Sequence, residues 1–389
     1  MPVRIGTGLS TLGDPKAAAI AAATEAGRAL GDRSCDLAVI FVSGAHLARP
    51  GAMLEGVHEA LAPAGLVGCG SAGVIAQARG LQDTTAIAVW AAAFGGGRTQ
   101  TFHATAAGAA DEDADLEVDG LVDLDGAAGA LLLADPYTFP TPALLARLSA
   151  AHPRLPLIGG LASAHAPGAR TPLFIDDRVV DSGAVGARFD GVRISQWVSH
   201  GAVPVGPELT ITAAEGKVVS ELAGQPALLK LRETVAKLEH DEQQLVRDGL
   251  LVGIVVDANK PEYVQGDFLV RGLVGADPDT NEITIGSTVR PGQVLRLHVR
   301  DAASADRDLR RGPNRSWAEL RGERAGGALL ISCNGRGTSL FGSEHHDAQA
   351  VHDQLGGIPI AGFFAAGEIG PAGSGSFLHS LTATVAVFG

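Results

Sequence analysis

The chain has 389 residues, of which 46% are hydrophobic and 19% are charged, and its formal net charge is −13. This length exceeds what one hydrophobic core usually supports, so we expect two domains, and the composition excludes a largely disordered chain. We expect no nucleic-acid partner, because the basic residues are scattered apart from a short cluster at Arg307, Arg310, Arg311 and Arg315, whereas a nucleic-acid binder needs a broad positive face.

Three further features predict the compartment. The sequence has no apolar run of about 18 residues, the minimum for a transmembrane helix, so we expect no membrane partner. Glycines, Asp14 and Pro15 interrupt the N-terminal segment before the apolar region of a signal peptide could form. The cysteines are odd in number and far apart, which is not a disulfide framework: Cys35, Cys69 and Cys333. Together these features predict a cytoplasmic protein.

The first part of the chain predicts a helix followed by a four-element unit. Residues 14–30 form an alanine-rich helix pattern, with Asp14 as the N-cap and Pro15 at the first helical position. The segments that follow predict a strand, a helix, a strand and a strand in turn: residues 36–43, 48–61, 66–75 and 84–94.

This order of elements recurs twice. A second copy predicts a strand, a helix and a strand at residues 129–136, 141–150 and 155–164. A third copy predicts a strand, a helix and two strands at residues 327–337, 343–355, 358–367 and 380–388. Aligned on Gly68, Gly159 and Gly362, the copies read VGCGSAGV, IGGLASAH and AGFFAAGE. Matching elements at matching spacing are the mark of an internal repeat.

A block of different pattern separates the second and third copies. It predicts strands at 192–201 and 208–223, one long helix at 226–249, and a hairpin around the turn at 277–282. The expected fold class is mixed α/β (α+β): two domains built from repeated strand-helix-strand-strand units that form mixed sheets flanked by helices. Residues 1–35 would add a strand and a helix to a first domain at 36–205, and residues 206–389 would form the second.

The glycine-rich strand ends raise the question of a phosphate-binding loop. Residues 68–73 match the motif G-x-G-x-x-G, but the element that follows is predicted to be a strand, whereas a dinucleotide site needs a helix at that position. No glycine run precedes Lys-Ser or Lys-Thr, as a Walker loop requires. We therefore interpret the glycines as tight turns or close backbone approaches, and we expect no cofactor.

The third copy differs from the other two in the polar residues at its strand ends. Glu368 lies in an apolar, glycine-rich stretch, so a buried carboxylate that needs a partner is expected, with Arg336 or His379 as that partner. The alternatives are a ligand contact and an ion pair that only locks the loop. Cys333 is either core or a thiolate activated by Arg336 or His379.

The predicted helix at 343–355 opens with Ser343 as its N-cap and places Glu344 on the side of its core stripe, which would aim Glu344 toward the Cys333 loop. No His or acid spacing there matches a metal site, so no metal is expected. Polar residues also occupy matching strand ends in the first two copies, where they either line a related cavity or complete turns: Ser71, Asp135, Ser163 and His165.

The sequence SCNGRG at 332–337, a helix opening with Glu344, and the blocks IAGFFAAGEIGP and FLHSLT resemble the C-terminal domain of the FIST family. LVGCGSAGVI, LLLADPYTFP and LPLIGGLASA resemble the companion FIST N-terminal domain. The resemblance covers roughly residues 36–389, with the boundary near residue 205.

The resemblance implies a sensory protein that binds a small molecule, such as an amino acid, and signals through a separate protein. Arg336 would bind the ligand carboxylate and Glu368 or Glu344 its ammonium group. The full set of expected ligand-binding residues is Cys333, Asn334, Arg336, Glu344, Gly367, Glu368, His379, Ser71, Ser163 and His165. The alternative is a cysteine-dependent hydrolase or transferase, with Cys333 as nucleophile, His379 as base and Glu368 as orienting group. The sequence does not indicate an oligomeric state.

Overall fold

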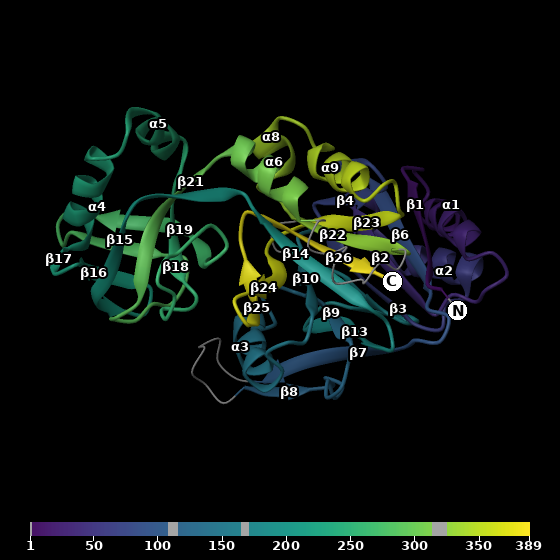
Figure 1. Ribbon diagram of the computed structural model, residues 1–389. Helices are drawn as coiled ribbons and strands as arrows, with labels where there is room; N and C mark the ends of the chain where they lie inside the picture. The colour runs from purple at the N-terminus through teal and green to yellow at the C-terminus, as the bar shows by residue number, and fades with distance from the viewer. Residues whose placement is uncertain (1, 108–115, 165–170, 313–324) are drawn as a thin grey trace. The chain divides into compact units, whose positions relative to one another are not determined.

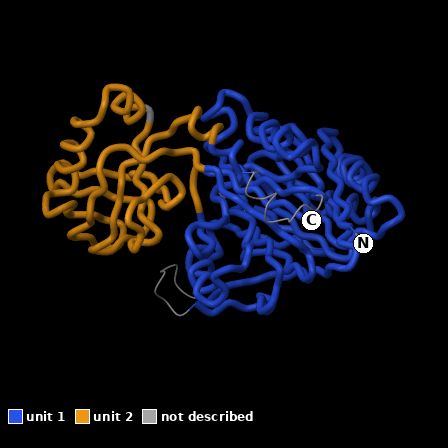
Figure 2. The backbone as a smooth tube through the Cα atoms, in the orientation of Figure 1, with its two compact units in different colours: residues 1–199, 308–378, 382–389 blue, residues 200–307, 379–381 orange. Residues whose placement is uncertain are grey.

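The computed structural model describes residues 2–107, 116–164, 171–312 and 325–389. The chain divides into two compact units (Figure 2): residues 1–199, 308–378 and 382–389 form unit 1, and residues 200–307 and 379–381 form unit 2. The third predicted copy thus belongs to the same unit as the first two, and the block between the copies forms a unit of its own.

The described residues of unit 1 form three mixed sheets (Figure 1). The first sheet has the order β1 (Arg4–Ser10), β6 (Ala86–Ala93), β2 (Leu37–Ser43), β3 (Leu66–Ser71), β11 (Leu173–Ile175), β12 (Arg178–Val180). The second has the order β8 (Glu117–Asp119), β7 (Arg98–Ala107), β13 (Ala184–Asp190), β9 (Gly129–Ala134), β10 (Leu157–Leu161), β24 (Glu368–Ala372), β25 (Gly375–His379). The third has the order β14 (Ile194–His200), β26 (Thr382–Phe388), β22 (Gly327–Cys333), β23 (Ile360–Ala365), β4 (Gly73–Ala76), β5 (Arg79–Gln82).

The three sheets share one plan. Each has a parallel pair at its centre, namely β2 with β3, β9 with β10, and β22 with β23. In each, the strand after the parallel pair crosses to another copy: β4 joins β23, β24 joins β10, and β11 joins β3, all antiparallel. The three copies are therefore tied together by exchanged strands, and the predicted mixed α/β class is confirmed.

The aligned glycines lie where two backbones approach closely. Gly68, Gly159 and Gly362 pair with Ile40, Leu132 and Leu330 in the parallel registers. A Cβ atom at any of the three positions would overlap the carbonyl oxygen of that partner. The structural interpretation of these glycines is confirmed. Strand β4 begins at Gly73, so no helix follows the first glycine stretch and a dinucleotide has no helix N-terminus to bind.

Residues from all three sheets share one apolar core. Phe41 stacks on Phe363 with ring centroids 4.9 Å apart, and Phe388 lies 5.1 Å from Trp90 and 5.4 Å from Phe189. Helices and short 3-10 turns complete the unit: α1 (Pro15–Gly27), η1 (Arg28–Leu30), η2 (Gly44–Ala48), α2 (Pro50–Leu61), α3 (Thr141–Ala151), α8 (Gly337–Phe341) and α9 (His346–Gln354). The Asp14 side chain accepts a hydrogen bond from the Ala17 N–H at 2.9 Å, as predicted for the N-cap of α1.

Unit 2 contains an antiparallel barrel. Its strands pair in the order β15 (Ala202–Glu215), β21 (Val294–Arg300), β18 (Leu250–Val255), β19 (Phe268–Asp277), β20 (Glu282–Ile285), β16 (Val218–Leu222), and β16 pairs back with β15. The short β17 (Gln225–Pro226) pairs antiparallel with β16, and α6 (Ala302–Arg311) follows β21. The hairpin predicted around residues 277–282 is the β19–β20 pair.

Two helix predictions need correction. The predicted helix at 226–249 is two helices, α4 (Ala227–Ala236) and α5 (His240–Asp248), because Glu239 forms a capping box with Glu242 and starts α5 anew. Helix α9 begins at His346, since the Ser343 hydroxyl accepts from the nearby N–H of His345 and does not cap the helix. Across the described ranges, no helix is long and apolar enough to cross a membrane.

Candidate functional site

The polar residues of the third copy gather where β22 ends and β24 begins. After Cys333, the Asn334 N–H donates to the carbonyl of Ala365 at 2.9 Å, and the Arg336 N–H donates back to the Cys333 carbonyl at 2.9 Å. Glu368 opens β24 and pairs with Gly160 of β10. The chain turn after β22 and the strand exchange between copies thus deliver Arg336 and Glu368 to one region of unit 1.

Glu368 is fully buried, as expected from its apolar context. Its Oε2 atom accepts two hydrogen bonds from Thr382, one from the N–H at 3.1 Å and one from the hydroxyl at 2.8 Å. Burial raises the pKa of Glu368 to about 8, although Thr382, the neighbouring Cys333 and the charge of Arg336 all favour the ionised form. Glu368 is therefore mostly a neutral carboxylic acid at pH 7.

Arg336 does not form an ion pair with Glu368, which corrects the expected partnership. Its guanidinium, also fully buried, binds Asp347 of α9 twice, from Nε to Oδ2 at 2.6 Å and from Nη2 to Oδ1 at 3.0 Å. It also lies 5.2 Å from the ring centroid of Phe341. Burial disfavours the charged guanidinium, but Asp347 outweighs burial, and the pKa of Arg336 lies above its ordinary value.

Asp347 is a site residue that the sequence analysis missed. Besides its two hydrogen bonds from Arg336, it accepts one from the Ser332 hydroxyl at 2.7 Å. Its Oδ1 atom also lies 3.0 Å from His346 Nδ1. Burial alone would raise the pKa of Asp347, yet Arg336 and these hydrogen bonds hold it well below its usual range. Asp347 precedes the core residue Val351 by one helical turn, which is the signal that could have placed it on the buried face.

Three buried polar atoms of this region have no hydrogen-bond partner among the described residues. They are Nη1 of Arg336, Oδ1 of Asn334 and Oε1 of Glu368. The charge of Glu368 acts on Arg336 and that of Arg336 acts on Glu368, so these groups lie within electrostatic reach of each other. We call Cys333, Asn334, Arg336, Asp347 and Glu368 the polar cluster. Cys333 is 8% exposed, and its sulfur accepts the Gly335 N–H at 3.4 Å.

Two of the other predicted residues connect copies of the repeat. The Ser163 hydroxyl donates to the Phe364 carbonyl and accepts from the Ala72 N–H at 3.0 Å, which joins all three copies. The Glu344 carboxylate accepts from the Gln82 N–H of β5 at 2.7 Å. These hydrogen bonds of Ser163 and Glu344 therefore tie segments of different copies together.

The remaining predicted residues lie elsewhere or are used locally. The Ser71 hydroxyl donates to the carbonyl of Gly73 at 2.9 Å, and the Gly367 carbonyl accepts from Leu161 N–H at 2.8 Å. His379 belongs to unit 2, where its ring lies 5.9 Å from that of His200. His165 lies outside the described residues.

The first two copies close their corresponding strand ends locally. Ser43, which ends β2 as Cys333 ends β22, donates its hydroxyl to the Thr84 carbonyl at 2.6 Å. Asp135, next after β9, accepts from the Thr138 N–H at 2.9 Å and the Thr138 hydroxyl at 2.7 Å. Open polar atoms beside a buried acid therefore distinguish the third copy from these two strand ends.

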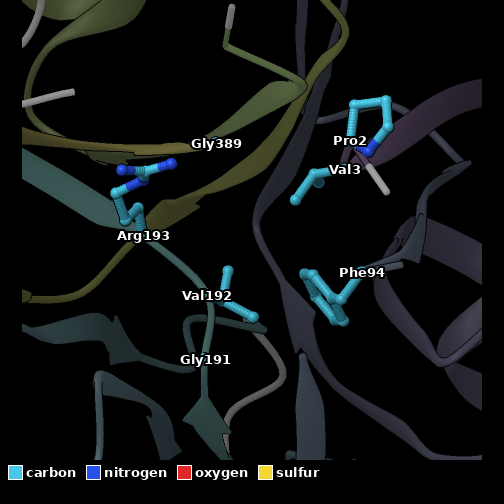
Figure 3. Close-up of a pocket in the computed structure, with 7 residues that line it drawn as sticks. All are labelled: Pro2, Val3, Phe94, Gly191, Val192, Arg193 and Gly389. Carbon is cyan, nitrogen blue, oxygen red and sulfur yellow. The ribbon is translucent and has the colours of Figure 1, made fainter. Parts of the chain in front are cut away.

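A pocket of about 370 Å³ lies at the other end of the central strands (Figure 3). Gly327, at the start of β22, pairs with Phe388 beside the pocket, whereas Cys333 ends the same strand. The pocket is lined by Pro2, Val3, Phe94, Gly191, Val192, Arg193 and Gly389. Within the described ranges, no group of three His, Cys, Asp or Glu side chains is arranged to hold a metal ion.

Comparison with known proteins defines the class. The FIST N domain matches residues 36–225 and the FIST C domain matches residues 227–371. The chain therefore belongs to the FIST family, which confirms the resemblance seen in the sequence. FIST domains are associated with signal-transduction sensing.

The relatives are similar along their whole length. An uncharacterised protein of Mycobacterium tuberculosis is 43% identical over 99% of this chain and 100% of its own, and one of Mycobacterium bovis is 42% identical over 99% of both. A solved structure of a cyanuric acid hydrolase aligns with 100% of both chains at 9% identity and a TM-score of 0.31. That likeness is too low to carry an inference.

Proposed function

We propose that this protein is a small-molecule-sensing FIST protein whose ligand binds at the polar cluster. The observation that carries the proposal is the set of three buried polar atoms without partners in the described part of the chain: Arg336 Nη1, Asn334 Oδ1 and Glu368 Oε1. In folded proteins, about nine in ten buried polar groups are hydrogen-bonded, so three open atoms in one region call for an explanation.

The energetic argument favours a polar ligand. Each buried donor or acceptor left without a partner costs on the order of 1–3 kcal/mol, and a ligand that satisfies all three recovers that free energy. The set offers a donor at Arg336 and an acceptor at Asn334, so the ligand needs complementary groups of both kinds. An amino acid or a related small metabolite has them.

The proposal also covers how the protein signals and where in the cell it lies. The ligand-bound protein would act on a separate signalling protein, since the family is associated with signal-transduction sensing. A cytoplasmic location agrees with three buried cysteines that form no disulfide among the described residues.

A thermal-shift screen of metabolites, followed by calorimetric titration of the hits, tests the proposal. Asn334→Leu removes one open acceptor without touching the Arg336–Asp347 ion pair, so it should weaken binding at least tenfold. Asn259→Leu, at an exposed asparagine of unit 2, is the matched control and should bind as wild type does. Equal affinities for the two variants, or no saturable ligand, would contradict the proposal.

The enzyme hypothesis has one supporting observation, the contact between Cys333 and Glu368 that favours ionisation of the acid. Its expected base, His379, belongs to unit 2. Ester and thioester hydrolysis by wild type and by Cys333→Ser tests it: a rate that depends on Cys333 would favour the enzyme over the sensor.

A further inference from the structure

Cys333 differs from the other two cysteines of the chain in its surroundings. It is 8% exposed, whereas Cys35 is 2% and Cys69 0% exposed. Its sulfur accepts the Gly335 N–H at 3.4 Å, and its side chain is hydrogen-bonded to Glu368. Burial raises the pKa of Cys35 to about 11 and raises that of Cys69 as well. The three thiols should therefore differ in reactivity, with Cys333 the most reactive.

The groups beside Cys333 promote attack by its sulfur. The Gly335 N–H and the charge of the Arg336 guanidinium both favour a sulfur anion. Glu368, bonded to the thiol side chain, can exchange a proton with it. An ionised Glu368 would take the thiol proton and pass it on, while a neutral Glu368 would give up its own proton and take the thiol proton in return. The carboxyl group therefore relays one proton in either protonation state.

The open atoms of the polar cluster indicate which molecule the sulfur would attack. Arg336 Nη1, Asn334 Oδ1 and Glu368 Oε1 are buried and have no hydrogen-bond partner among the described residues. Asp347 already neutralises Arg336 through two hydrogen bonds, so the site favours an uncharged molecule. Hydrogen peroxide is uncharged and little larger than water, with two O–H donors and lone pairs on both oxygens. It therefore has a group to offer each of the three open atoms.

We propose that Cys333 is a site of oxidation by hydrogen peroxide, which the open atoms of Arg336, Asn334 and Glu368 bind beside the sulfur. The sulfur attacks one peroxide oxygen and forms an S–O bond while the O–O bond breaks. The thiol proton passes by way of Glu368 to the departing oxygen, which leaves as water. Sulfur is oxidised and the peroxide is reduced, so that one thiol and one hydrogen peroxide give one sulfenic acid and one water.

The positions of the other cysteines decide the fate of the sulfenic acid. Cys333 ends β22 of the third sheet, whereas Cys35 lies just before β2 and Cys69 lies in β3, both of the first sheet. We therefore expect no disulfide within the chain to follow, and the sulfenic acid should persist until an external thiol reduces it. The inference goes beyond the proposed function, because the signal is a covalent change that needs no bound metabolite.

Mass spectrometry of the individual cysteine peptides tests the proposal on the full-length protein. Folded protein is treated with hydrogen peroxide at pH 7, quenched with catalase, and unfolded in guanidinium with dimedone, which traps sulfenic acids. We expect Cys333 to be oxidised at least tenfold faster than Cys35 and Cys69, which are controls within the same molecule. In protein unfolded before the treatment, the three cysteines should react at similar rates. Equal rates in the folded protein, or no oxidation of Cys333, would overturn the proposal.

Two matched variants test the role of Glu368. Glu368→Gln can keep both Thr382 hydrogen bonds through its carbonyl oxygen but cannot relay a proton, so oxidation of Cys333 should slow at least tenfold. Glu208→Gln, at an exposed acid on β15, should be oxidised at the wild-type rate. An unchanged rate in Glu368→Gln would refute the proposed step.

Iodoacetamide distinguishes a peroxide site from a merely accessible thiol, because it cannot use the proton relay to a departing oxygen. Relative to free cysteine, native Cys333 should react at least tenfold faster with hydrogen peroxide than with iodoacetamide. Equal relative rates for the two reagents would contradict the proposal. These failures would leave the proposed function in place, since the effect of Asn334→Leu on metabolite binding is measured without peroxide.

Discussion

Replacement of Glu368 by glutamine tests the buried neutral acid through protein stability. Burial raises the pKa of this group from 4.5 to about 8. Between these two values the unfolded chain releases the proton while the folded protein retains it, so the free energy of unfolding falls as the pH rises. The contribution is fully present below pH 4.5 and is lost by about pH 8.

The magnitude follows from about 1.4 kcal/mol per pKa unit. The loss specific to Glu368 is about 3 kcal/mol at pH 7 and about 5 kcal/mol above pH 8. Glutamine has no proton to lose and can accept both Thr382 hydrogen bonds through its carbonyl oxygen, so Glu368→Gln should not show this loss.

Urea unfolding of both proteins at intervals from pH 4.5 to pH 9 measures the difference. The stability of Glu368→Gln relative to wild type should increase by about 1.4 kcal/mol per pH unit and level off above pH 8. Parallel stability curves for the two proteins over this range would refute the reasoning, because they would mean that Glu368 titrates normally in the folded state.

Three further predictions concern the surroundings of the site. Asp347→Ala leaves Arg336 buried and unpaired, so it should lower the free energy of unfolding by about 3–5 kcal/mol in urea titration, whereas the double change Arg336→Met with Asp347→Leu should cost less. Gly362→Ala places a Cβ atom against the Leu330 carbonyl oxygen and should destabilise the folded protein by about 1–3 kcal/mol in thermal unfolding. The control Gly51→Ala, in α2 with open space around it, should leave the stability unchanged or raise it slightly. All three cysteines are buried, and burial raises the pKa of Cys35 to about 11. Native protein should therefore react with iodoacetamide far more slowly than protein unfolded in guanidinium. Fast alkylation of Cys333 at pH 7 would contradict this prediction and favour the enzyme hypothesis.

The fold was predictable from the sequence where the signals were local. Asp14 and Pro15 fixed the start of α1, and the apolar runs located the central strands of each copy. The alignment identified Gly68, Gly159 and Gly362 as equivalent, and in the structure each pairs with the first strand of the parallel pair in its own copy. The exchange of strands between copies was not predictable, because the pairing of β24 with β10 joins segments about 200 residues apart and depends on tertiary packing.

The sequence predicted which residues belong to the site better than it predicted the contacts between them. Glu368 was expected to be buried and is, because an acid within an apolar, glycine-rich run has few ways to reach water. Arg336 was expected, with His379 as the alternative, to be the partner of Glu368, but it pairs with Asp347, which the sequence analysis did not single out. The open atoms of Asn334, Arg336 and Glu368 depend on atomic geometry, which residue spacing does not encode.

The most direct measurement is a crystal structure of the protein with the small molecule that the screen and the titrations select. We predict density for that molecule within hydrogen-bond distance of Arg336 Nη1, Asn334 Oδ1 and Glu368 Oε1. Ordered water alone at these three atoms, with the molecule bound elsewhere, for example in the pocket lined by Val3, Phe94 and Val192, would contradict the account.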